Sequence, residues 1–297
     1  VVRHAIDCGC DPLIAIQMAT INTACHFGME RELGSITPGR RADFIVTSSI
    51  DDLPIDVVFA RGERVAENGK LLTKCPHYEW PQTVRKTVNL GKKLERKDFM
   101  ISAPIGLSSV KAKVIGVIEN QAPTKALEFN LPVEQGNVQL EGDVCYLSLV
   151  ERHRGTGAVV NGFVSGFGYT ESMAIASSVA HDSHHMIVVG TNQEMMASAA
   201  NRLGEVGGGV SLWKDGSEVA LVELPIAGLM SDSNASEVAD KAQAIVSAMI
   251  DCGCTLNNAY MQHTLLALVV IPELRISDLG LVDVNRFELT NIIETNS

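Results

Sequence analysis

Residues 186–224 read MIVVGTNQEMMASAANRLGEVGGGVSLWKDGSEVALVEL. The apolar run at 186–189 predicts a short buried strand. Thr191 and Glu194 have the spacing of a capping box, in which each side chain accepts a free N–H group at the start of a helix. We expect the helix to end at Val206, because three consecutive glycines follow it. A buried strand followed at once by an amphipathic helix indicates a fold that mixes helices with a sheet.

The segments on either side extend this pattern. Strands are predicted at 210–213 and 218–224, around a turn that contains Asp-Gly. Asn234 and Glu237 repeat the capping-box spacing and open a second helix, whose apolar positions are Val238, Ala242, Ile245 and Met249. Further β-like runs lie at 113–118, 144–150 and 158–164. We therefore predict the fold class α+β, with a two-layer α+β domain over residues 101–297.

Residues 1–32 are predicted to be helical. Asp11-Pro12 is a helix-start signal, because the carboxylate can accept free N–H groups and a proline in the first turn loses no hydrogen bond. One apolar stripe follows at helical spacing, formed by Ile14, Met18, Ile21 and Cys25. The chain begins with Val1 and no initiator methionine, so we expect it to start inside a longer polypeptide that supplies partners for this stripe. Without those partners, residues 1–72 are expected to be poorly packed.

Residues 33–72 change to a turn-rich β pattern. Short strands are predicted at 42–46, 57–60 and 64–66, with tight turns at Arg61-Gly62 and Asn68-Gly69. Such a small β-unit is too short to fold alone. Residues 73–100 place Pro76 and Pro81 among many lysines and arginines, which predicts a linker that crosses a surface.

The composition excludes several classes of protein. A formal charge of -11 argues against non-specific binding to nucleic acid or to anionic membranes. No apolar run is long enough to span a bilayer, and no secretory signal is visible. The seven cysteines are expected to stay reduced in a cytoplasmic protein. Their two Cys-x-Cys pairs are closer than the usual zinc-ligand spacing, so we predict no metal site in this chain.

The densest polar cluster is His181-Asp182-Ser183-His184-His185. Histidine binds metals or moves protons near neutral pH, and a carboxylate can fix the tautomer of a neighbouring ring. In an extended segment His181, Ser183 and His185 would face one way, and Asp182 and His184 the other. The alternative is a hydrogen-bonded turn without substrate contact. His181, Asp182 and His184 are the candidate site residues.

Other polar positions are explained without chemistry. No Gly-x-Ser-x-Gly surrounds Ser177 or Ser178, and the glycine clusters do not match a nucleotide-binding loop. Arg152, His153 and Arg154 could attract an anion or form a solvated loop. Asp232 and Glu273 could be functional carboxylates, although a helix cap and a turn also account for them.

The order of motifs along the chain resembles the bacterial adenine deaminases of the amidohydrolase superfamily. The less specific part of the resemblance is a helix followed by Gly34-Ser35-Ile36, Pro38-Gly39-Arg40-Arg41 and Ala42-Asp43. The more specific part lies in the second half of the chain. It comprises Ala176–His184, Asn201-Arg202, Gly207-Gly208-Gly209, Leu224–Ser231, Ile271–Ile276 and Gly280–Val284.

The resemblance implies a fold and a reaction for the longer protein. Residues 1–32 would be the last helices of a TIM-like amidohydrolase barrel, 33–72 the closing part of a small β-domain, and 101–297 the C-terminal domain typical of adenine deaminases. The parent would hydrolyse adenine to hypoxanthine and ammonia with hydroxide activated by manganese or iron, in adenine catabolism and purine salvage. The family's metal-binding motifs are absent here, so we expect this chain alone to be inactive.

Three alternatives remain at this point. The chain could belong to another amidohydrolase that acts on a cyclic amide or a different aminated base, or residues 101–297 could be a structural or oligomerisation module. A free-standing binding protein is the third alternative, but it does not fit the apolar stripe at the start of the chain. The apolar stretch 264–271 suits either a core or an interface between copies of a homo-oligomer.

Overall fold

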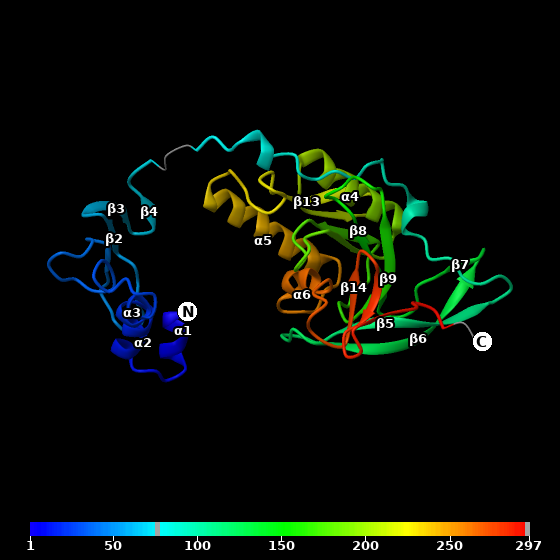
Figure 1. Cartoon of the computed structure of the whole chain (residues 1–297), viewed down its shortest axis with the longest axis horizontal. Helices are drawn as coiled ribbons and strands as arrows, with labels where there is room; N and C mark the ends of the chain where they lie inside the picture. The colour runs from blue at the N-terminus through cyan, green and yellow to red at the C-terminus, as the bar shows by residue number, and fades with distance from the viewer. Residues whose placement is uncertain (75–77, 295–297) are drawn as a thin grey trace. The chain divides into compact units, whose positions relative to one another are not determined.

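The computed structural model describes residues 1–74 and 78–294, which form two compact units, Val1–Glu79 and Trp80–Ser297 (Figure 1). Pro76, one of the two prolines of the predicted linker, lies outside the described residues. No helix of the described chain has the length and apolar character needed to cross a membrane.

Three short helices open the first unit: α1 (Val2–Asp7), α2 (Pro12–Ala19) and α3 (Ile21–His26). The predicted helix start at Asp11 is confirmed, because its carboxylate accepts from the backbone N–H groups of Leu13 and Ile14 at 2.9 and 3.1 Å. These contacts satisfy two of the donors that a helix leaves free at its first turn.

A small antiparallel sheet follows in the order β1-β2-β3-β4. Its strands, three of them predicted, are β1 (Phe44–Val46), β2 (Val57–Ala60), β3 (Glu63–Glu67) and β4 (Lys70–Leu71). The two predicted tight turns are confirmed, since Arg61-Gly62 and Asn68-Gly69 have positive φ at both residues. Paired positive φ values match the twist of antiparallel strands.

This first unit buries little of its apolar surface. Within residues 1–74 the buried hydrophobic residues are Ala15, Ala24 and Leu53. Ile14 and Met18, which belong to the predicted apolar stripe, are 53% and 57% exposed. The expected poor packing is therefore confirmed, and the stripe has no core to join within this unit.

The second unit is built on a nine-stranded sheet in the order β13-β12-β10-β11-β8-β9-β5-β6-β7. All its pairings are antiparallel except that of β5 with β9. Its strands are β5 (Ser109–Val117), β6 (Thr124–Glu134), β7 (Asn137–Val138), β8 (Val144–Val150), β9 (Val159–Ser165), β10 (Met173–Ser177), β11 (Met186–Gly190), β12 (Gly209–Lys214) and β13 (Ser217–Glu223).

The sheet is covered on both faces, so the predicted two-layer arrangement is wrong (Figure 1). Along β8, Leu147 and Leu149 join one hydrophobic core, and Tyr146 and Val150 join another. A strand with apolar side chains in both directions must be covered on both faces. The covering helices are α4 (Gln193–Val206) for one core, and α5 (Ala235–Asp251) and α6 (Ala259–Leu265) for the other. A three-stranded sheet of β14 (Leu274–Ser277), β15 (Gly280–Asp283) and β16 (Glu288–Thr290) contributes to the core of α5 and α6.

Both predicted helices exist, but their first turns differ from the predicted capping boxes. The cap of α4 is Asn192, whose side chain accepts from the N–H groups of Glu194 and Met195. The hydroxyl of Thr191 instead donates to the Glu171 carbonyl. Asn234 precedes α5, but its side chain makes no capping hydrogen bond.

Much of the predicted linker is packed against the second unit. It contains two 3-10 turns, η1 (Gln82–Val84) and η2 (Arg96–Phe99). The backbone of Leu94 exchanges two hydrogen bonds of 2.9 Å with the Asn201 amide on α4. The side chains of Val88, Leu90, Leu94 and Phe99 are buried there. A segment with this much buried apolar surface is part of the folded unit.

Candidate functional site

The five residues of the polar cluster, residues 181–185, lie at the end of the loop between β10 and β11, and we call them the histidine turn. The backbone N–H of His184 donates to the Ala180 carbonyl at 2.7 Å, and that of His181 donates to the Thr264 carbonyl at 3.1 Å. His184 has a positive φ of 50°. Of the two conformations considered from the sequence, the segment therefore adopts the hydrogen-bonded turn, which closes before β11 begins.

The turn brings two of the three candidate residues together. The rings of His181 and His184 meet edge to face, with centroids 5.4 Å apart. Nδ1 of His184 accepts from the Ala180 N–H at 3.2 Å, so a neutral ring carries its proton on Nε2. Burial, followed by the nearby His181, lowers the pKa of His184. Asp182 is exposed and weakly opposes this shift in pKa.

Arg152 connects the turn to the body of the second unit. Its guanidinium donates from Nε to the His184 carbonyl and from NH2 to the Ala227 carbonyl, at 2.5 and 3.2 Å. The side chain is only 1% exposed, so it does not attract an anion from solvent as one interpretation of the sequence suggested. Its length lets it reach two loops. Burial lowers the pKa of Arg152, and the charge of the neighbouring Glu151 carboxylate partly offsets this.

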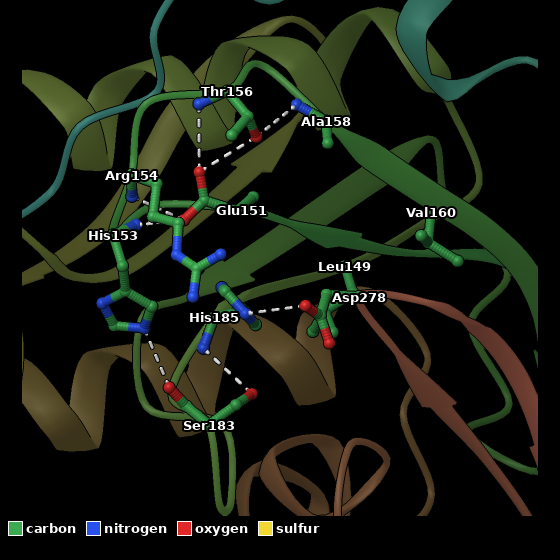
Figure 2. A pocket seen from close by; sticks show the side chains of 10 residues that line it. All are labelled: Leu149, Glu151, His153, Arg154, Thr156, Ala158, Val160, Ser183, His185 and Asp278. Carbon is green, nitrogen blue, oxygen red and sulfur yellow. Dashed lines mark hydrogen bonds and ion pairs between the residues drawn. The ribbon is translucent and has the colours of Figure 1, made fainter.

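On its other side the turn borders a cavity of about 350 Å³, the β8 cavity (Figure 2). Side chains from the end of β8, the loop after it, β9, the turn and the β14–β15 connection line it. The lining residues are Leu149, Glu151, His153, Arg154, Thr156, Ala158, Val160, Ser183, His185 and Asp278. Ser183 and His185 thus line the cavity, whereas the predicted residues His181, Asp182 and His184 do not.

Glu151 organises the loop that follows β8. One carboxylate oxygen accepts from the N–H groups of His153 and Arg154, at 2.5 and 2.7 Å. The other accepts from the N–H and the hydroxyl of Thr156, both at 3.0 Å (Figure 2). Burial opposes ionisation of Glu151, but these four donors outweigh it and lower the pKa to about 2. The role is not visible in the sequence alone, because three of the four donors are backbone groups.

A second pair of histidines lies at the cavity. The rings of His153 and His185 are 4.8 Å apart, and Nε2 of His153 lies 2.9 Å from the Ser183 carbonyl, to which it donates. Nε2 of His185 lies 3.6 Å from a carboxylate oxygen of Asp278. Burial lowers the pKa of His185 more than Asp278 raises it. His153 and Asp278 lie far from the turn in sequence, and only the fold brings them beside it.

The remaining candidate positions have structural explanations. Asp232 forms an ion pair with Arg85 at 2.5 Å, and a carboxylate oxygen of Glu273 accepts from the Ala126 N–H at 2.7 Å. The six described cysteines are free, and burial raises the pKa of Cys252 to about 11. Within residues 1–74 and 78–294, no three His, Cys, Asp or Glu side chains are grouped so that they could hold a metal ion.

Two segments of the chain match models of known protein families. Residues 121–288 match the family model of the adenine deaminase C-terminal domain, and residues 1–65 match that of the amidohydrolase family. The chain is 69% identical over 99% of its length to an adenine deaminase of Ruegeria pomeroyi and to another of Roseobacter denitrificans. It is 43% identical over 99% of its length to an adenine deaminase of Moorella thermoacetica. In each case the chain covers 49% of the relative, so it spans about half the length of these relatives.

Proposed function

Because this chain belongs to the adenine deaminase family, we propose that it is the C-terminal part of an enzyme that hydrolyses adenine to hypoxanthine and ammonia. The observation that supports this proposal is the 69% identity to a curated adenine deaminase across 99% of the chain. The identity includes the second unit, which carries the match to the adenine deaminase C-terminal domain. A general amidohydrolase acting on a cyclic amide is the less favoured reading, because the amidohydrolase match alone covers only residues 1–65.

The proposed parent requires a divalent metal ion, manganese or iron, which would supply hydroxide near neutral pH. The residues described here do not fit such an ion, since no cluster of suitable ligands occurs within 1–74 and 78–294. We therefore propose that the metal of the whole enzyme is held by the part that corresponds to the half of the relatives' sequences that this chain does not cover. In this proposal residues 1–32 close the barrel and 33–72 complete the small β-domain.

We further propose that His181, Asp182 and His184 contact or orient adenine in the whole enzyme. The hydrogen bond from the Ala180 N–H to Nδ1 fixes the His184 tautomer, which leaves an N–H at Nε2. The lowered pKa keeps that ring neutral at pH 7, so it is a donor without charge. Three of the four ring nitrogens of adenine are acceptors, and a neutral donor can bind one of them without a large desolvation cost.

A chimera tests the reaction. This chain replaces the matching half of the Ruegeria pomeroyi adenine deaminase, and the unmodified relative serves as the folding and activity control. We expect the chimera to release ammonia from adenine with hypoxanthine as product. A well-folded chimera that acts on cyclic amides or other aminated bases, but not on adenine, would refute the assignment.

Two variants of the chimera test the histidine turn. His181→Ala and His184→Ala are each expected to lower kcat/KM for adenine at least about tenfold, the usual cost of one lost polar contact in the transition state. Glu205→Ala, at an exposed position of α4, is the control. Unchanged turnover in both turn variants would show that the turn has no part in the reaction.

A cytoplasmic location, assembly as a homo-oligomer and the absence of nucleic-acid binding remain predictions from the sequence.

A further inference from the structure

His184, whose ring is the proposed donor to adenine, has an unfavourable backbone conformation. Its φ of 50° lies in the left-handed region that residues other than glycine rarely adopt. Within the turn, the Ala180 N–H donates to the His184 ring at Nδ1, and the Ala180 carbonyl accepts from the His184 N–H. These local contacts do not involve the His184 carbonyl, so a donor from outside the turn is needed to hold that end of the residue.

Arg152, two residues after β8, supplies that donor. Its Nε donates to the His184 carbonyl at 2.5 Å, and its NH2 donates to the Ala227 carbonyl at 3.2 Å. Because the guanidinium is planar, one rigid group fixes the directions of both hydrogen bonds. The guanidinium also lies close against Gly228, where a Cβ would stand 2.7 Å from NH1. A larger residue at that position would displace the guanidinium.

The segment that holds the other end of this contact is itself fixed. Residues 226–230 form a closed loop, with two backbone hydrogen bonds of 3.0 Å between its end residues. The buried hydroxyl of Ser178 accepts from the Gly209 N–H at 2.7 Å and donates to the Gly228 carbonyl at 2.6 Å. These bonds tie the loop to the start of β12 and to the β10–β11 connection. The Ala227 carbonyl is therefore a fixed point from which Arg152 can hold the turn.

We propose that Arg152 is a positioning residue of the proposed adenine hydrolysis: it joins the His184 carbonyl to the fixed loop and so holds the His184 ring in the orientation in which Nε2 donates to adenine. This inference rests on the proposed function and deepens it. The Arg152 side chain is 1% exposed, so it can affect the reaction only through the residues that it contacts. Its contribution to turnover should then disappear when the His184 ring is removed.

A double-mutant cycle in the chimera tests this dependence. Arg152→Met keeps an extended side chain but has no donor for either carbonyl. Alone, it should lower kcat/KM for adenine at least about fivefold, and by no more than His184→Ala does, because misplacing a ring cannot cost more than removing it. When His184→Ala is already present, adding Arg152→Met should lower kcat/KM by less than about twofold.

Leu131→Ala is the control for a loss of stability alone. Leu131 is fully buried on β6, which β9 and β5 separate from β8 in the sheet. Its truncation destabilises the core far from the turn, so kcat/KM should change by less than about twofold while the protein stays folded. Thermal unfolding of each variant sets an assay temperature at which all of them are folded.

Nitrogen NMR of the His184 ring in this chain tests the same contact without turnover. Above the pKa of the ring, the unmodified chain should show one tautomer with the proton on Nε2, because Nδ1 accepts from the Ala180 N–H. In Arg152→Met the turn is free to relax, so the Nδ1 resonance should move toward the average of the two tautomers. In Leu131→Ala it should not move.

Two results would overturn the inference. One is additive losses in the cycle, which would show that Arg152 acts independently of His184. The other is an unchanged His184 tautomer in Arg152→Met. Failure of the proposed function looks different, because the unmodified chimera would then not convert adenine, while the NMR experiment would still decide whether Arg152 holds the ring.

Discussion

The substitution Glu151→Gln tests how the loop beside the histidine turn is held. The new amide can place its NH2 group toward Thr156, whose hydroxyl can reverse its role and accept. The Thr156 N–H then loses its acceptor, and the N–H groups of His153 and Arg154 exchange a charged acceptor for a neutral one. One unsatisfied donor and two weakened bonds together cost about 2–3 kcal/mol.

The pKa of Glu151 gives a similar magnitude. Lowering it from 4.5 to about 2 corresponds to about 3 kcal/mol of preferential binding of the charged form in the folded chain. Since the folded-state pKa is depressed, this stabilisation is present above pH 4.5 and is lost as the pH falls toward 2. About half of it should remain near pH 3.

Urea and thermal unfolding at pH 7, followed by circular dichroism, measure the effect. Glu151→Gln should lower the free energy of unfolding by about 2–3 kcal/mol and the Tm by about 5–10 °C. Glu205→Gln, which removes one exposed ion pair with Arg202, is the control and should change it by less than about 0.5 kcal/mol. A loss below about 0.5 kcal/mol in Glu151→Gln, or a difference that does not shrink on acidification, would refute the reasoning.

Three further predictions concern other parts of the second unit. Arg152→Met removes the donors of two loop carbonyls, so we expect about 2 kcal/mol lower stability and faster hydrogen exchange in the histidine turn; unchanged exchange there would contradict this. Burial lowers the pKa of His263 to about 3, so the unfolded chain binds a proton below pH 6.5 that the folded chain refuses. On acidification from pH 7 to 5.5, the free energy of unfolding should therefore fall by about 1 kcal/mol less in His263→Leu than in the unmodified chain. Equal falls in the two proteins would contradict this prediction. In Gly209→Ala the new Cβ would lie 1.9 Å from the Val222 carbonyl oxygen, so we expect the free energy of unfolding to fall by more than about 3 kcal/mol. In the control Gly216→Ala nothing lies within 4 Å of the new Cβ, and the expected fall is about 1 kcal/mol.

The elements predicted with the correct type are those with strong local signals. Residues 144–150 were predicted as a strand and form β8, and α4 ends at Val206 as predicted. The left-handed conformation of Gly207, with φ of 87°, ends that helix in the expected way. Capping glycines and uninterrupted apolar runs act within a few residues, so a sequence alone reveals them.

The missed elements depend on distant partners. β6 contains three charged residues and Pro132, and its position is fixed by nine residue pairs with β5. β10 ends in Ser177 and lies between β11, the next strand, and β12, which follows only after α4. The two-layer prediction missed that helices cover both faces of the sheet, with α5 and α6 opposite α4. Local periodicity does not reveal which face of a sheet a helix covers.

The role of the histidine turn stays a prediction, and its geometry could not be read from the sequence. The turn at His184 places Ser183 and His185, not the three predicted residues, on the cavity. His153 and Asp278 join them only through the pairing of β8 with β9 and the position of the β14–β15 connection. Such contacts depend on strand order, which the sequence did not provide.

The most direct test of the central claim compares adenine hydrolysis by this chain with hydrolysis by its chimera with the Ruegeria pomeroyi adenine deaminase. Both are assayed with added Mn²⁺ or Fe²⁺, and hypoxanthine is quantified by chromatography. The proposed function predicts that the chimera converts adenine and that the chain alone does not. Metal-dependent conversion of adenine by this chain alone would contradict the account, because a catalytic metal site would then exist among these residues.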